Sequence, residues 1–255
     1  MSITGLLGRG LVLVGIVAGL LAMGLSFAAE SRYIDDGTQV AFLVVLLSLA
    51  SWLPADVGPP LLGGAMGAAA FGFYLFIPSS AAFDSFGYLD AGAWLGLCTV
   101  LIPIGYLVIW SAELEGEEAD VRNTRSIGLP VSTVGLVLIA VGIWLDIGSH
   151  GPTYWNLSSS GHAAGLLMIV LVVLNALLIG GQAHTSFRAG NLDVLVAAAT
   201  FGYVEVAWIN AAFGGFGSLG AGAWIEACGG VLLLVGVLAP RFAWVRAVAA
   251  GAPAA

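Results

Sequence analysis

The chain has 255 residues, of which 60% are hydrophobic and 9% carry charge, and its mean hydropathy is +1.03. A soluble domain carries charge on about a quarter of its residues, so most of this chain is predicted to lie in lipid. Seven arginines, no lysine and fifteen acids leave a net charge of -8, which excludes the basic surface typical of nucleic-acid binding.

Eight apolar runs follow one another along the chain. They span residues 5–28, 39–53, 60–78, 90–110, 128–147, 162–181, 193–212 and 220–239. Each is near the ~20 residues that a helix needs to cross the hydrocarbon core, and lipid excludes sheets with free edges. The predicted fold is all-α, a polytopic integral membrane protein with eight transmembrane helices.

The first run resembles a secretory signal, because Arg9 lies near its start and the small-residue segment FAAE ends it. Its length, and the recurrence of its GLVL (residues 10–13) at residues 135–138, predict instead that it stays in the membrane. The third run is predicted to end at Pro78, since proline lacks a backbone donor and its ring clashes with the preceding turn.

One segment of the chain occurs twice. Residues 71–98 align without a gap with residues 201–228, at a constant offset of 130 and with thirteen identities in twenty-eight positions. Chance would give roughly two or three identities, so the sequence predicts a tandem duplication. The predicted parts are a four-helix repeat (1–110), a charged cytoplasmic linker (111–127), a second four-helix repeat (128–240) and a short cytoplasmic tail (241–255).

The arginines predict the orientation of the spans. With eight spans, one side holds six of the seven arginines, namely Arg9, Arg122, Arg125, Arg188, Arg241 and Arg246, and the other side holds Arg32. Arginine concentrates on the cytoplasmic side, so both termini are predicted to be cytoplasmic, in the inner (plasma) membrane. Because four is an even number, the two repeats are predicted to run parallel, related by a pseudo-twofold axis along the membrane normal.

The duplicated segment supports two interpretations. As structure, Gly92 and Gly96 form a small-residue face on which helices approach closely, and Trp94 and Trp224 belong to an aromatic belt at the membrane surface. As function, six aromatic residues line the outer vestibule of a conduit at the interface between the repeats. These residues are Phe83, Phe86, Trp94, Phe213, Phe216 and Trp224.

The two copies differ in polar residues within the predicted spans. Glu205 replaces Leu75, Glu226 replaces Gly96 and Asn210 replaces Ser80, so these groups occur in the second copy alone. An ionisable group inside a span costs at least ~2.5 kcal/mol and usually faces the bundle interior, a partner or water. Glu205, Glu226 and Asn210, with Asn175 of the sixth run, are therefore the candidate solute-pathway residues.

Glu205 and Glu226 are predicted to lie at similar depth in adjacent helices. If their carboxyls face each other, repulsion and burial favour the protonated form, and a shared proton suits a pH-gated or proton-coupled pathway. The alternative is that each acid hydrogen-bonds a neighbouring helix and only holds the bundle together. For Asp90, Asp146, His150 and His162, a solvated outer rim is the expected location.

Enzyme and metal signatures are missing from the sequence. It has no GxSxG, HExxH, Walker A or CxxCH motif, so an enzyme is not predicted, and neither is a cofactor. The two cysteines, Cys98 and Cys228, occupy equivalent positions and are read as small packed thiols. Two histidines without a Cys/His cluster do not predict a metal site.

The second copy resembles a known family of channels. Phe201-Gly202-Tyr203, then Ile209-Asn210, then Phe216-Gly217 before Trp224 is similar to the FG(F/Y)...IN...FG...W arrangement of the AmiS/UreI family of urea and short-chain amide channels. The resemblance implies a narrow channel lined by aromatic and aliphatic side chains, which passes small uncharged solutes and assembles as a homo-oligomer. A second resemblance is to the acetate uptake family. Both families have six spans, where this chain has eight predicted.

The leading hypothesis is a membrane channel or transporter for a small solute such as urea, a short amide or a short-chain acid. Its expected partners are the lipid bilayer, the solute and further copies of the chain, with no nucleic acid. The second hypothesis is a non-transporting scaffold or subunit of a larger membrane complex, in which the glycine faces bind partners. The third is an intramembrane enzyme built on Glu205 and Glu226.

Overall fold

A computed structural model describes most of the predicted spans. The described residues are 3–28, 31–32, 49, 60–81, 90–113, 125–147, 153–156, 162–183, 191–214 and 219–241. The predicted second run (39–53), apart from Leu49, lies outside them, as do residues 114–124 of the predicted linker and 242–255 of the predicted tail.

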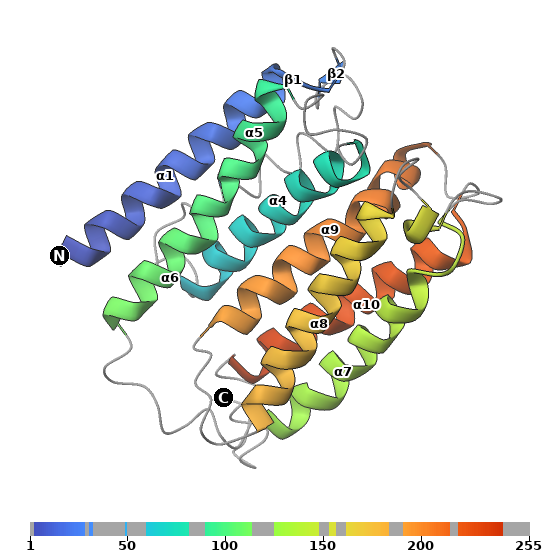
Figure 1. The fold of residues 1–255 in the computed structure, drawn as a ribbon. Helices are drawn as coiled ribbons and strands as arrows, with labels where there is room; N and C mark the ends of the chain where they lie inside the picture. Colours follow the sequence, from blue (N-terminus) through green and yellow to red (C-terminus); the bar gives the residue numbers. More distant parts are fainter. Residues whose placement is uncertain are drawn as a thin grey trace.

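Within the described ranges the chain is helical apart from one short ladder (Figure 1). The helices are α1 (Ile3–Gly24), α4 (Pro60–Ala81), α5 (Ala91–Leu97), α6 (Leu101–Glu113), α7 (Arg125–Gly142), α8 (Ala163–Ala183), α9 (Leu192–Gly214) and α10 (Ala221–Leu238), with 3-10 turns η2 (Cys98–Val100), η3 (Tyr154–Asn156) and η5 (Ala239–Arg241). The antiparallel strands β1 (Ser26–Ala28) and β2 (Ser31–Arg32) follow α1.

Among the described residues, four helical segments are long and apolar enough to cross a membrane. They are Ile3–Gly24, Ala91–Trp110, Ala164–Gly181 and Ala221–Arg241, and Leu61–Phe76 and Gly128–Gly142 are shorter apolar helices. The all-helical, membrane-compatible character predicted from composition is thus confirmed for the described part of the chain.

Two prolines have different effects on their helices. The predicted end of the third run at Pro78 is wrong, because α4 continues through it to Ala81. Proline removes a single backbone donor, and with three residues left in the helix little ladder remains to be lost. Pro103 lies near the start of α6 and cannot donate to the carbonyl of Thr99, one turn earlier, where the 3-10 turn η2 separates α5 from α6.

Helices α7 and α10 pack antiparallel along glycines spaced seven residues apart. Gly128 faces Gly236 and Gly135 faces Gly229, and a side chain at any of these four positions would collide with the opposite backbone. Close approach of helix backbones is the usual packing in lipid, where small residues replace hydrophobic burial as the source of association. The next glycine of α7 in this spacing, Gly142, faces the side chain of Glu226 instead of a glycine.

Helices α1 and α6 pack in the same manner at the other side of the bundle. Gly8 contacts Gly105 and Ile109, while Gly15 contacts Ile102 of α6 and Gly19 contacts Thr99 of the preceding turn. These contacts place Gly8 and Gly15 where α7 has Gly128 and Gly135, an offset of 120 residues. The offset of 125 from the GLVL match is therefore not the register in which these helices pack.

Helices α4 and α9 lie side by side at the centre of the bundle (Figure 1). Their contact is reciprocal: Gly72 lies against the carbonyl of Ala199, and Gly202 lies against the carbonyl of Ala69. The two contacts are related by the offset of 130, so each copy makes the same contact with the other. Each glycine leaves room for the backbone of the opposite helix.

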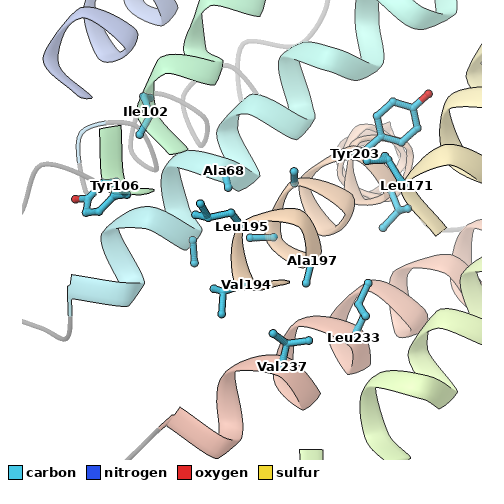
Figure 2. Packing of buried hydrophobic residues seen from close by; sticks show 14 of the residues in the cluster. Ala68, Ile102, Tyr106, Leu171, Val194, Leu195, Ala197, Tyr203, Leu233 and Val237 are labelled. Carbon is cyan, nitrogen blue, oxygen red and sulfur yellow. The ribbon is translucent and has the colours of Figure 1, made fainter. Parts of the chain in front are cut away.

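The buried core surrounds α9, which packs against α4, α8 and α10, and it continues past α4 to Ile102 and Tyr106 of α6 (Figure 2). Two tyrosines within this core keep their hydroxyls bonded. Tyr74 of α4 donates to the carbonyl of Gly19 in α1 at 2.7 Å, and Tyr203 of α9 donates to that of Ala164 in α8 at 3.2 Å. These bonds join α4 to α1 and α9 to α8. They also satisfy hydroxyl groups for which lipid offers no partner.

Candidate functional site

Glu226 is fully buried on the α7 side of α10, with 0% of its surface exposed. Its side chain fills the space left by Gly142, where an added Cβ would collide with Cγ and would lie 3.0 Å from Oε1. The chain just beyond closes over it, because the amides of Gly220 and Gly222 donate to the carbonyls of Ile147 and Asp146. Glu226 therefore lies inside the second copy, beneath a hydrogen-bonded turn.

Glu205 lies on the other side of α10 and is 7% exposed. Its Oε1 is buried without a hydrogen-bond partner and lies 3.3 Å from where a Cβ of Gly230 would be. Gly230 is one turn further along α10 than Glu226, a rise of roughly 6 Å. Glu226 thus extends from α10 towards α7, and Glu205 of α9 contacts α10 within one turn of Glu226.

A pair of tryptophans lies beyond Glu205 on the seam between α9 and α10. Trp208 and Trp224 are in edge contact, with ring centroids 6.0 Å apart and planes at 79°. Trp208 lies less than one turn beyond Glu205, nearer the Gly214 end of α9. Trp224 and its counterpart Trp94 are 43% and 49% exposed, as expected of aromatic residues in a membrane-surface belt.

The structure leaves several predicted site residues without a described side chain. Phe83, Phe86 and Phe216 lie outside the described residues. Asn210 and Phe213 belong to α9, but their side chains lie outside the description. The vestibule interpretation of these aromatic residues therefore stays a prediction.

Asn175 has a defined structural partner in α9. Its Nδ2 donates to Thr200 Oγ1 and to the carbonyl of Leu171, both at 2.8 Å, and Thr200 in turn donates to the carbonyl of Val196. Asn175 and Thr200 are both buried. The pair joins α8 to α9 about one and a half turns from Glu205.

A buried ion pair occurs where sequence reasoning had placed no site. Arg241 Nη2 contacts both carboxylate oxygens of Asp193, at 2.6 and 2.7 Å, and Asp193 is 2% exposed. The signal was present in the sequence, since the offset of 130 places Gly63 and Ser111 at the equivalent positions. Extending the comparison beyond residues 71–98 would have shown a third acid acquired by the second copy.

Of the four residues predicted at a solvated outer rim, the structure describes Asp90, Asp146 and His162. Asp146 and His162 are exposed, as predicted, and Asp90 is partly exposed. The ring of His162 stacks on Trp155 with centroids 4.5 Å apart, and its Nδ1 is 2.6 Å from the Trp155 carbonyl. Among the described residues, no group of three or more His, Cys, Asp or Glu is placed to hold a metal ion.

No family model, curated protein or solved structure matches this chain. The resemblance to the amide-channel family therefore stays a prediction.

Proposed function

We propose that the protein is a channel or transporter for a small solute, built from two parallel four-helix repeats in the inner membrane with both termini cytoplasmic. The repeat assignment is supported by the reciprocal contact of Gly72 and Gly202 and by the matching glycine packing of α1 with α6 and α7 with α10. Four long apolar helices support the membrane location.

The burial of Glu226 and Glu205 around one turn of α10 carries the proposal. An acid in the bilayer interior costs at least ~2.5 kcal/mol, and the first copy forms the equivalent helices with Gly96 and Leu75 instead. The helical packing therefore does not require the acids. A solute or proton that uses them gives a reason for their cost.

The chemistry of the acids favours some solutes over others. A carboxyl group accepts hydrogen bonds from N–H donors whether or not it is protonated, which suits urea and short amides. A short-chain acid would have to enter as the neutral molecule, because an anion beside buried carboxyl groups is repelled. Within the proposed solutes, urea and short amides are thus the better fit.

The scaffold hypothesis depends on glycine faces that are free to bind partners. In the described bundle, Gly72 lies against the backbone of α9 and Gly202 against that of α4, Gly135 faces Gly229, and Gly8 faces α6. These faces are used inside the chain, which supports transport over a scaffold role. Assembly with further copies of the chain remains part of the proposal.

The test is solute flux into proteoliposomes that contain the purified protein. We expect urea or acetamide to enter faster than into protein-free liposomes, and Glu205→Gln or Glu226→Gln to reduce the rate. Each substitution keeps the side-chain shape and removes the ability to ionise. Asp90→Asn is the control, because it removes an acid at the partly exposed start of α5. Equal permeability with and without the wild-type protein would refute transport of these solutes.

A further inference from the structure

The ion pair of Asp193 and Arg241 lies at the opposite end of the α9–α10 seam from Glu205. Asp193 is in the first turn of α9, and Arg241 ends the 3-10 turn that follows α10. From Asp193, Thr200 is about 10 Å along α9 and Glu205 about 18 Å. The seam thus carries the buried Glu205 near one end and a partly buried ion pair at the other.

Arg241 ties several parts of this end together. Besides the two contacts with Asp193, its Nη1 donates to the carbonyl of Val237 in α10, and its Nε is 3.4 Å from Asn191 Oδ1 just before α9. The charges also suit their positions, because an acid is favoured at the N-terminus of a helix and a cation at the C-terminus. The start of α9 and the end of α10 are held together by one guanidinium group.

Packing alone does not explain the pair. The first copy has Gly63 and Ser111 at these positions, and its helices α4 and α6 still pack against each other, through Gly64 with Trp110 and Tyr106. Only the copy that contains Glu205 and Glu226 thus joins two helix ends through an ion pair that buries Asp193. A contact that both copies needed for folding would be expected in both.

We propose that the Asp193–Arg241 pair is the inner gate of the solute pathway. When the pair is formed, it closes the cytoplasmic end of the α9–α10 seam. Opening requires the guanidinium group to leave Asp193 and the end of α10 to separate from the start of α9. This inference rests on the proposed function for its purpose, but the movement can be measured without any solute.

The test measures access of a water-soluble thiol reagent to the middle of α9 from the cytoplasmic side. The reporter is Thr200→Cys in the full-length protein with Cys98→Ser and Cys228→Ser, because Thr200 is 0% exposed and lies between the gate and Glu205. The matched control reporter is Ala70→Cys, at the equivalent position of the first copy and also 0% exposed. Each reporter is combined with Asp193→Asn, and with the exchanged pair Asp193→Arg and Arg241→Asp.

We expect Asp193→Asn to raise the labelling rate at Thr200→Cys by about tenfold or more, because the guanidinium group of Arg241 loses the carboxylate that holds the seam closed. The exchanged pair should return the rate towards that of the wild type, and labelling at Ala70→Cys should stay unchanged. A rate at Thr200→Cys that does not respond in folded protein would overturn the gate. A parallel rise at both reporters would also overturn it, since that indicates general loosening.

Flux separates this inference from the proposed function. If Asp193→Asn raises the labelling rate at Thr200→Cys while neither wild type nor variant passes urea or acetamide, the gate stands and the proposed solutes are wrong. If the wild type passes solute and the reporter does not respond, transport stands and the gate is wrong.

Discussion

Glu226 occupies a space that exists only because α7 has glycine at position 142. A methyl group there would collide with Cγ of Glu226, and the buried acid has no room to retreat. By the packing offsets of 120 and 130, the first copy has Ala22 and Gly96 at the equivalent positions. The glycine of this pair is therefore on opposite helices in the two copies. Glu226 and Gly142 are therefore expected to behave as one unit.

We predict that Gly142→Ala destabilises the protein by about 1–3 kcal/mol, the usual cost of an added methyl group in a packed core. Thermal unfolding in detergent measures this loss. Gly142→Ala together with Glu226→Gly restores the first-copy arrangement and should recover much of the stability while removing the acid. That double variant is the folded, acid-free control for flux. Additive losses in the two single variants and the double variant would contradict the coupling.

At the scale of the helices, backbone contact between glycines joins the two copies. Gly202 lies against the carbonyl of Ala69, while Gly180 of α8 has open space around it. The same substitution at these two positions therefore separates interhelical contact from helix propensity. Alanine in place of glycine favours an isolated helix by up to ~1 kcal/mol, so only a collision can reverse that sign.

We predict that Gly202→Ala lowers the unfolding temperature, because the α4–α9 contact must open for the methyl group to fit. Gly180→Ala is predicted to leave that temperature unchanged or raise it. Both variants are measured by thermal unfolding in the same detergent. Equal effects at the two positions would show that the contact between α4 and α9 contributes nothing to stability.

Sequence periodicity and composition account for the helices but not for their partners. The duplicated segment predicts that positions 72 and 202 are equivalent, yet nothing in it indicates that each glycine lies against the backbone of the other copy's helix. The seven-residue glycine spacing of α7 and α10 is visible in the sequence, but its meaning depends on which helix lies opposite. Glu205 and Glu226 could be singled out as costly, whereas their positions on two sides of α10 follow from the packing.

At the scale of the whole molecule, the two repeats are proposed to share one direction across the membrane. The prediction of packed thiols is wrong, because Cys98 and Cys228 are both exposed on the bundle surface. They occupy equivalent positions and offer native reporters of the orientation. Each is the eighth residue counted from the start of its helical segment, at Ala91 and Ala221. At 1.5 Å per residue, both lie roughly 10 Å from the helix start.

We predict equal membrane depths for the two thiols when each is labelled with a small fluorophore in Cys98→Ser or Cys228→Ser protein. Quenching by lipids with quenchers at different depths measures this in proteoliposomes, and a quencher confined to one leaflet should act on both labels equally. Parallel repeats require both results, because a rotation about the membrane normal preserves depth. Inverted repeats would place the labels in opposite leaflets, separated by about 10 Å of the ~30 Å hydrocarbon core, and that outcome would exclude the proposed architecture.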